Sequence, residues 1–241
     1  MVPLSFAPFQ FAGQEWLLGP ARALAWPEEQ ALLVADLHLE KASWFARTGQ
    51  MLPPYDSRET LDRLAALVRH TGARRVFCLG DNFHDAHGPT RLDPGAAERL
   101  AALVRVVDWV WITGNHDEKD GHVGKDGAPA DDLIGGTMLR EVMVRGVMLR
   151  HEAQGQEAGP ELSGHFHPRL RVAARGRTVS RPCAVMSERK LILPAFGALT
   201  GGLDAAHPAL LKAMQPARSI TALVPTAARV AHFPLWQAAA A

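Results

Sequence analysis

The stretch ALLVADLHLE (residues 31–40) decides the fold, because it joins a short apolar run to an acid and a histidine. The run is typical of a buried strand, and the chain turns polar at Asp36 and His38. The same arrangement recurs in RVFCLGD (75–81) and in the apolar run that leads to GNHD (114–117). Ligands of open α/β sheets bind beyond the carboxyl ends of the strands, so these polar ends are expected to converge in space.

Helix-forming segments separate these three strands. The first is expected to begin at Asp56, where Glu59 completes a capping-box pattern, and to end at Gly72. The second is expected to begin at Asp93 with Pro94 in the first helical position. The order β-α-β-α-β predicts a largely parallel sheet covered by helices.

The rest of the chain is richer in strand-like runs. A polar loop is expected over residues 117–136, and Gly146 and Gly176 are expected to form hairpin turns. The expected strands outside the central unit are 15–18, 22–26, 139–144, 147–149, 170–174, 178–185 and 190–193. They predict a second sheet packed against the first. No linker or composition shift divides residues 1–241, so a single α/β domain is expected.

Composition excludes several classes of protein. Hydrophobic residues make up 47% and charged residues 21%, which is typical of a globular chain and not of a disordered one. The net charge of +1 argues against a generally polybasic binder. Cys78 and Cys183 lack CxxC spacing, which favours a reducing compartment. No targeting segment or membrane-spanning apolar run is recognisable, so a soluble cytoplasmic protein without a membrane partner is expected.

Several oxygen-bearing and imidazole side chains follow the expected strands. They are Asp36, His38, Asp81, Asn115, His151, His165 and His167. One divalent cation cannot use all seven and leave room for a substrate, whereas two cations that share a carboxylate can. Mixed carboxylate, amide and imidazole ligands suit manganese, iron or zinc better than calcium. Two such cations about 3.5–4 Å apart are the usual arrangement for displacement at phosphorus.

The spacing within the pairs Asp36-x-His38 and His165-x-His167 suggests a shared direction, because residues i and i+2 of an extended backbone point the same way. Taken singly, these residues have simpler explanations, such as a helix cap, a turn residue or a surface histidine. The joint occurrence of all the motifs in one order favours the metal-binding interpretation.

Five blocks carry a family resemblance. They are D-x-H (36–38), GD-x(2)-HD (80–85), GNHD (114–117), the lone His151 and GHFH (164–167). In this order they resemble the calcineurin-like metallophosphoesterases. ADLHLEK (35–41), LPPYDSRETLDRL (52–64) and LPAFGALTGGL (193–203) are similar to the bacterial ligase-associated DNA damage response endonucleases, the PdeM group. The resemblance implies an αββα sandwich, in which two packed mixed sheets are flanked by helices.

The resemblance also implies a role for each site residue. Asp36, His38 and His167 would bind one cation, Asn115, His151 and His165 the other, and Asp81 both. The cations would most often be Mn²⁺, with iron or zinc also compatible, and a hydroxide bridging them would attack phosphorus. His116 would protonate the leaving group, Asp117 would orient His116, and His84 would face the scissile phosphate. Glu40 stands where similar sequences often have glycine, and could alter the loop near the first cation or offer a further carboxylate.

A basic stretch bears on the substrate. Between residues 169 and 190 the cations are Arg169, Arg171, Arg175, Arg177, Arg181, Arg189 and Lys190. The arginines all have odd numbers, so one face of paired strands could carry them and attract a nucleic-acid backbone. The alternative is a charged, solvated edge strand. Few aromatic residues interleave with this stretch, so it does not indicate a base-stacking platform.

These observations predict an enzyme. The expected function is hydrolysis of DNA phosphodiester bonds by an endonuclease, in DNA repair. The alternatives are a phosphodiesterase or phosphatase that acts on small nucleotides or other small phosphoesters, and a scaffold that has lost catalysis. The family association suggests a DNA ligase and a helicase as partners.

Overall fold

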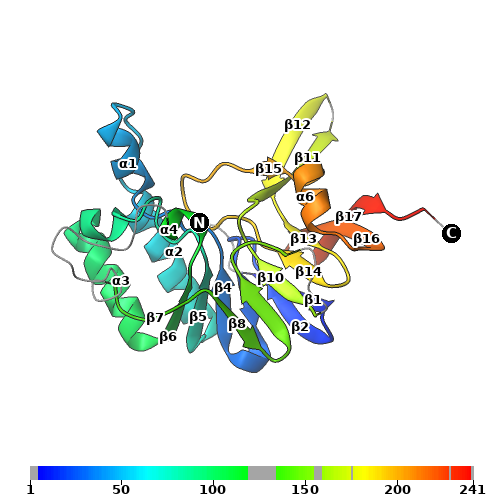
Figure 1. Ribbon diagram of the computed structural model, residues 1–241, viewed down its shortest axis with the longest axis horizontal. Coiled ribbons are helices and arrows are strands. Elements are labelled where there is room, and N and C mark those ends of the chain that lie inside the picture. The colour runs from blue at the N-terminus through cyan, green and yellow to red at the C-terminus, as the bar shows by residue number, and fades with distance from the viewer. Residues whose placement is uncertain (1–4, 119–133, 155–158, 175, 228, 240–241) are drawn as a thin grey trace.

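The computed structural model describes residues 5–118, 134–154, 159–174, 176–227 and 229–239. Two seven-stranded sheets stack face to face, with α2 and α3 on the outside of the first and α6 on the outside of the second (Figure 1). This arrangement is the expected αββα sandwich.

The first sheet contains the expected parallel unit. Its strands, in spatial order, are β1 (Ala7–Phe11), β2 (Gln14–Leu18), β3 (Leu24–Trp26), β4 (Ala31–Val34), β5 (Arg75–Leu79), β6 (Asp108–Ile112) and β7 (Thr137–Leu139). Strands β1 to β4 are antiparallel neighbours, and β4 to β7 are parallel neighbours. Strand β1 was not among the expected elements. All three polar strand ends therefore leave the same edge of this sheet.

The second sheet is mixed. Its strands, in spatial order, are β17 (Val230–Gln237), β16 (Ser219–Pro225), β13 (Ala184–Met186), β14 (Lys190–Ile192), β10 (Glu161–Ser163), β9 (Val147–Arg150) and β8 (Glu141–Val144). The expected strand 139–144 is divided, because Leu139 ends β7 in the first sheet and Glu141 begins β8 in the second. The expected turn at Gly146 is present with a φ of 78°. Strands β16 and β17 were not predicted.

A small third sheet projects from the sandwich. It consists of β12 (Arg177–Pro182), β11 (Pro168–Ala174) and β15 (Leu203–Asp204). Arg171 pairs with Ser180, and Leu170 pairs with Arg181. Directly paired residues share a face, so Arg171 and Arg181 lie on opposite faces of the hairpin. The prediction that all these arginines lie on one face is therefore wrong. Across the turn at Gly176, odd-numbered residues of β11 pair with even-numbered residues of β12.

The two expected helices begin where they were predicted to begin, and three further helices, α1, α4 and α6, were not predicted. They are α1 (Lys41–Arg47), α2 (Asp56–Thr71), α3 (Pro94–Val106), α4 (Asn115–Glu118) and α6 (Pro208–Ala213), with 3-10 turns at Pro27–Glu29 and Gly88–Arg91. Asp93 caps α3 as expected, accepting hydrogen bonds from Gly95 N and Ala96 N. The predicted capping box at Asp56 is wrong, because Asp56 is the first residue of α2 and not its N-cap. Its carboxylate accepts a hydrogen bond from Ala42 N of α1. Within the described residues, no helix is long and apolar enough to cross a membrane.

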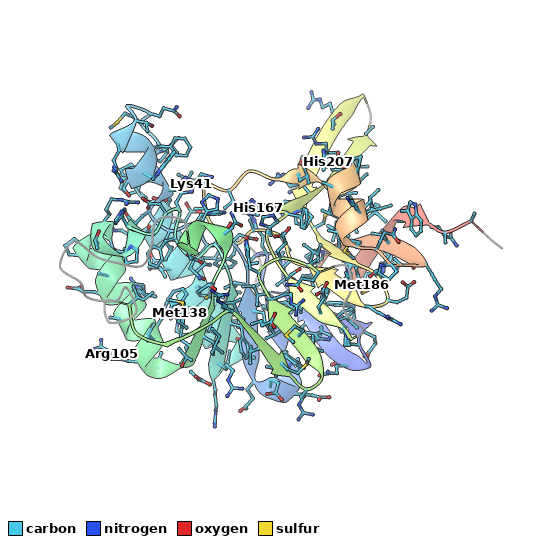
Figure 2. All side chains as sticks on the ribbon, viewed as in Figure 1. Lys41, Arg105, Met138, His167, Met186 and His207 are labelled. Carbon is cyan, nitrogen blue, oxygen red and sulfur yellow. The ribbon has the colours of Figure 1, made fainter. Side chains whose placement is uncertain are left out.

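One side of the sandwich carries two projections. Helix α1 and the β11–β12 hairpin both extend on the side where Lys41 and His167 are labelled (Figures 1 and 2). The sequence did not predict α1, because it shows no capping signal at the start of this helix. In the structure, Glu40 is the N-cap residue and its side chain makes no capping hydrogen bond.

A buried apolar layer joins the two sheets. It includes Trp16, Trp26, Leu33 and Phe77 of the first sheet and Leu191 of the second. The indole rings of Trp16 and Trp26 are 4.3 Å apart between centroids. Burial of such large apolar side chains is the main stabilising contribution to the stacking of the sheets.

Replacing Trp16 with alanine tests this packing. Trp16 is fully buried, so Trp16→Ala is expected to lower the free energy of unfolding by about 3–5 kcal/mol through lost transfer energy and a cavity. Urea denaturation monitored by circular dichroism measures the change. Val106→Ala, at a side chain that is 72% exposed, is the control and should stay within about 0.5 kcal/mol of the parent. Equal stability of the two variants would contradict this account of the core.

Candidate metal centre

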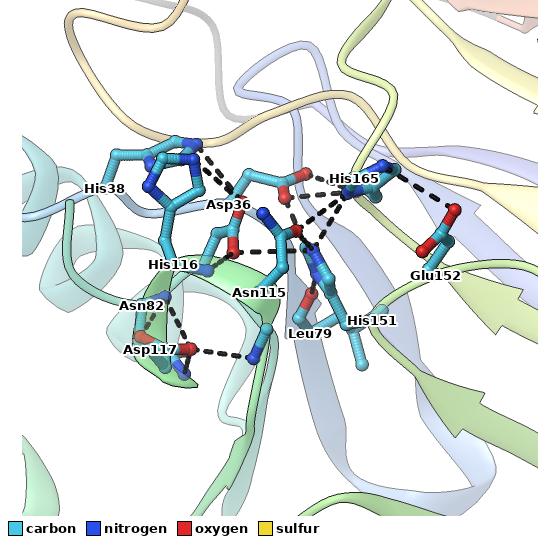
Figure 3. A network of polar contacts seen from close by, with 12 residues as sticks. Asp36, His38, Leu79, Asn82, Asn115, His116, Asp117, His151, Glu152 and His165 are labelled. Carbon is cyan, nitrogen blue, oxygen red and sulfur yellow. Dashed lines mark hydrogen bonds and ion pairs between the residues drawn. The ribbon is translucent and has the colours of Figure 1, made fainter. Parts of the chain in front are cut away.

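The seven ligand candidates come together at one edge of the sandwich. Segments after β4, β5 and β6 of the first sheet carry Asp36, His38, Asp81 and Asn115, and segments after β9 and β10 of the second carry His151, His165 and His167. Figure 3 shows His38 and His116 on one side of Asp36, with His151 and His165 on the other. The site therefore lies at the junction of the two sheets.

The first ligand group contains Asp36, His38, Asp81 and His167. One donor atom of each lies within 4.8 Å of the others. His38 Nε2 is 3.7 Å from Asp81 Oδ2, and His167 Nε2 is 3.5 Å from Asp36 Oδ1. The Nε2 atoms of the two histidines are 3.3 Å apart. This mixed donor set fits one divalent cation.

The second group contains Asp81, His151 and His165, again with donor atoms within 4.8 Å. Asn115 joins it, because its Oδ1 is 3.0 Å from His151 Nε2 and 3.1 Å from His165 Nδ1. His151 Nε2 is 3.4 Å from Asp81 Oδ1. Asp81 thus directs one carboxylate oxygen toward each group.

A backbone carbonyl orients one imidazole of the second group. His151 Nδ1 is 3.0 Å from the carbonyl oxygen of Leu79, which can only accept, so Nδ1 carries the proton and the Nε2 lone pair faces the ligand cluster. His165 Nε2 lies 3.7 Å from Glu152 Oε1, which is too long for a hydrogen bond. A carbonyl partner such as that of His151 holds a histidine in the tautomer and orientation that metal binding requires.

The ligands adopt an unusual backbone conformation. Asp36, His38, Asp81, His165 and His167 all have positive φ, between 43° and 71°. The expected extended backbone in the two x-spaced pairs is therefore wrong. Each left-handed residue costs about 1–2 kcal/mol, which the surrounding structure must offset.

Hydrogen bonds between loops hold this conformation. Asp36 N donates to Gly80 O at 3.1 Å, and His38 N donates to Asp81 O at 2.9 Å. Two glycines allow the loops to approach so closely: a Cβ on Gly114 would lie 2.2 Å from Asp81 N, and a Cβ on Gly80 would lie 2.2 Å from His151 Nδ1. These positions tolerate no side chain without displacing a ligand.

His116 and His84 lie beside the first group. Their rings are nearly parallel, with centroids 5.3 Å apart, and His116 Nδ1 is 2.8 Å from His84 O. Because a carbonyl only accepts, His116 carries a proton on Nδ1, and its Nε2 points toward Asp81 Oδ2 at 3.9 Å. His116 is thereby oriented by a backbone carbonyl.

Asp117 has a different role from the expected one. Its carboxylate accepts hydrogen bonds from the backbone N–H groups of Gly114, Asn82 and Phe83 and from the Asn82 side chain. The expectation that Asp117 orients His116 is wrong, since its oxygens face the loops after β5 and β6 and His116 Nδ1 faces His84. Burial raises the pKa of Asp117 to about 6 against the opposing effect of the N–H donors.

The electrostatics favour neutral imidazoles. Burial, followed by the positive potential of neighbouring histidines and Lys41, holds the pKa of His38 well below its ordinary value. Burial and the nearby Lys41 lower the pKa of His84 to about 4. Buried His38 Nδ1 has no hydrogen-bond partner among the described residues. Neutral nitrogens packed against two buried carboxylates are suited to binding divalent cations.

Glu40 is not a ligand in this arrangement. Its Oε1 accepts from Ser57 Oγ at 2.8 Å, and its backbone N donates to the same hydroxyl. Of the two alternatives for Glu40, the structure favours an effect on the loop, because Glu40 joins the loop after β4 to α2. Sequence reasoning also missed Asn82, which is buried and holds Ile112 O and Asp117. Its position directly after Asp81 was the available signal.

The comparisons with known proteins agree with this geometry. The model of the calcineurin-like phosphoesterase family matches residues 30–153, just over half of the sequence. The chain therefore belongs to the calcineurin-like phosphoesterase family, as its motifs indicated, and is a hydrolase of a family that uses divalent metals.

Two solved structures illustrate the likeness. The nuclease MPE of Pseudomonas putida is 29% identical, with a TM-score of 0.70, and the match covers 96% of this chain and 100% of that one. The phosphoesterase Yfce from E. coli is 17% identical, with a TM-score of 0.40, and the match covers 86% and 99% of the two chains. No curated protein matches the chain. The likeness to a nuclease is consistent with the PdeM-like resemblance.

Asp117→Ala tests the positioning role of this carboxylate. Several buried N–H groups would lose their acceptor, at about 1–3 kcal/mol each, so we expect the free energy of unfolding to fall by about 3 kcal/mol or more. Chemical denaturation measures the change. Asp108→Ala removes an exposed carboxylate that pairs with Arg75 and should cost less than about 1 kcal/mol. Comparable losses in the two variants would refute the role assigned to Asp117.

Proposed function

We propose that this protein is a two-metal phosphodiesterase that cleaves DNA as an endonuclease, with manganese as its cation and DNA repair as its setting. The observation that carries the proposal is the division of the ligands into two groups that share Asp81. The nuclease MPE, matched over nearly the whole chain, supports a nucleic-acid substrate.

The cations would be held by Asp36, His38 and His167 on one side, by Asn115, His151 and His165 on the other, and by Asp81 between them. When bound, they would activate water at neutral pH and neutralise charge on the phosphoryl oxygens. The protein's own contribution is to hold these ligands rigidly, with the Nε2 lone pair of His151 directed inward and the Asp81 oxygens directed apart.

His116 is proposed to assist the leaving group. Its Nδ1–H donates to His84 O, so a proton delivered to the departing oxygen would come from Nε2 of the imidazolium. The side chain is about one-third exposed, which leaves Nε2 accessible to a substrate. His84 stacks on His116 and is proposed to face the scissile phosphate.

Asp81→Asn tests the shared ligand. In the wild type, His116 N donates a hydrogen bond to Asp81 Oδ1 at 3.0 Å. The asparagine amide keeps an oxygen that can accept this bond, so we expect the variant to fold. Loss of the bridging charge should lower metal content and reduce phosphodiester hydrolysis by at least about 100-fold. Mass spectrometry of bound metal and circular dichroism provide the readouts, and Asp108→Asn is the control. Undiminished metal content and activity in Asp81→Asn would rule out the bridging role.

A substrate panel tests the reaction class. With Mn²⁺ the protein should cleave circular DNA and bis(4-nitrophenyl) phosphate, and chelation should abolish both activities. A phosphomonoester, a cyclic nucleotide and an RNA strand complete the panel. Activity confined to monoesters or to small nucleotides would replace the nuclease proposal with the alternative of small phosphoesters.

A further inference from the structure

The segment that joins β14 to β15 contacts two ligands of the first cation group. This connecting segment, residues 193–203, runs from the second sheet to α2 and returns to β15 (Figure 1). Gly197 N donates to Asp36 O at 3.2 Å, and Leu203 N donates to His167 O at 3.2 Å. Asp36 follows a strand of the first sheet, whereas His167 follows a strand of the second. One short piece of chain therefore links the backbones of two ligands that come from different sheets.

Two glycines bring the connecting segment against the ligand loops. A Cβ on Gly197 would lie 2.1 Å from Leu37 O, and a Cβ on Gly202 would lie 2.4 Å from His167 O. In both cases the obstacle is a backbone atom, so rotation of a side chain could not relieve the overlap. The connecting segment thus packs directly on the backbone of the ligand loops, and a displacement of this segment would displace the ligands.

Two arginines of the first-sheet layer hold the middle of the connecting segment. The guanidinium of Arg22, which lies between β2 and β3, donates to Ala195 O at 3.3 Å and to Gly197 O at 3.2 Å. Arg63 of α2 donates to the intervening carbonyl, Phe196 O, and its guanidinium carbon lies 4.4 Å from the centroid of the Phe196 ring. Three consecutive carbonyls of the segment therefore accept hydrogen bonds from guanidinium groups.

The backbone conformation of Arg22 is unfavourable for an arginine. The residue belongs to a tight turn, in which Gly19 N donates to Ala23 O at 2.9 Å and Arg22 N donates to Gly19 O at 3.1 Å. Its φ is 69°, in the left-handed region, where a residue with a Cβ is strained and glycine is not. The turn therefore favours glycine, and the hydrogen bonds of the guanidinium to the connecting segment account for an arginine at this position.

The positive charges of the two arginines are also unfavourable for each other. Every hydrogen bond of the Arg22 guanidinium within the described residues goes to an uncharged oxygen. Burial and the nearby Arg169 lower the pKa of Arg22, and burial and Arg22 lower the pKa of Arg63 to about 10. Glu59 opposes both shifts and lies 3.6 Å from Arg63. Partly buried cations that repel one another do not stabilise a fold by themselves. What the two arginines share is the connecting segment.

We propose that Arg22 is a positioning residue for the first cation, because it holds the connecting segment and thereby sets the spacing between Asp36 and His167. The inference rests on the proposed two-metal function and adds a residue to it. The effect of Arg22 is exerted through the backbone contacts of Gly197 and Leu203, which act on ligands of the first cation. Loss of the guanidinium should therefore weaken the first cation more than the second.

Manganese titration of Arg22→Gly tests the proposal. Glycine suits the left-handed turn, so this variant removes the guanidinium without straining the backbone. The metal-free proteins are titrated with Mn²⁺ and followed by electron paramagnetic resonance, in which two cations bridged by Asp81 give an exchange-coupled signal and a single cation does not. We expect Arg22→Gly to bind one cation as the wild type does, and to need about 10-fold or more Mn²⁺ to develop the coupled signal.

Arg145→Gly is the matched control. Arg145 is also left-handed, with a φ of 45°, but it lies between β8 and β9, at the end of β9 opposite to His151, and pairs with Glu28 and Glu29. This variant should keep the wild-type titration.

A second variant separates positioning from stability. Arg22→Ala removes the same guanidinium but keeps a strained backbone, so its metal-free form should unfold at lower denaturant than Arg22→Gly. It should nevertheless lose the coupled signal to the same extent. A manganese affinity that follows stability across these variants would reduce Arg22 to a structural residue and overturn the proposal.

The remaining outcomes distinguish this proposal from the proposed function. A coupled signal at the same Mn²⁺ concentration in the wild type and in Arg22→Gly would reject the positioning role and leave the two-metal function intact. Loss of both cations from an Arg22→Gly protein that circular dichroism shows to be folded would also contradict it, because the effect is expected at the first cation. A wild-type protein that binds only one Mn²⁺ would reject the two-metal function itself.

Discussion

The arrangement of the site depends on one shared carboxylate. Asp81 faces His38 through Oδ2 and His151 through Oδ1, while its carbonyl accepts from His38 N and its Oδ1 from His116 N. Gly114 leaves the space that this residue occupies. The loops after β4, β5 and β6 therefore meet at Asp81, and a shift of any one of them would move ligands of both groups.

This arrangement is costly for the isolated polypeptide. Asp36 and Asp81 are almost entirely buried, and left-handed backbone recurs along the ligand loops. Two buried carboxylates require a countercharge, which divalent cations would supply. The same features that would make the site unfavourable when empty prepare it to bind metal, because the ligands are already desolvated and oriented.

The two sheets contribute different ligands. Carboxylates and the amide come from the parallel strands of the first sheet, and the histidines after β9 and β10 come from the second. Each ligand group combines side chains from both sheets, so the layer that includes Trp16 and Trp26 holds the members of each group together.

The sequence alone predicted the parallel unit and the position of seven ligand candidates, because apolar periodicity and polar strand ends are local signals, and the family resemblance implied the αββα class. It also indicated the caps at Gly72 and Asp93. Tertiary structure decided the rest. The register of β11 and β12 distributed the arginines over two faces, packing imposed positive φ at Asp36 and His38, and contacts with α2 gave Glu40 a structural partner. The register, the positive φ values and the Glu40 contact all depend on residues that are distant in the chain. The free energy of these long-range contacts outweighs the conformational preference of the local sequence.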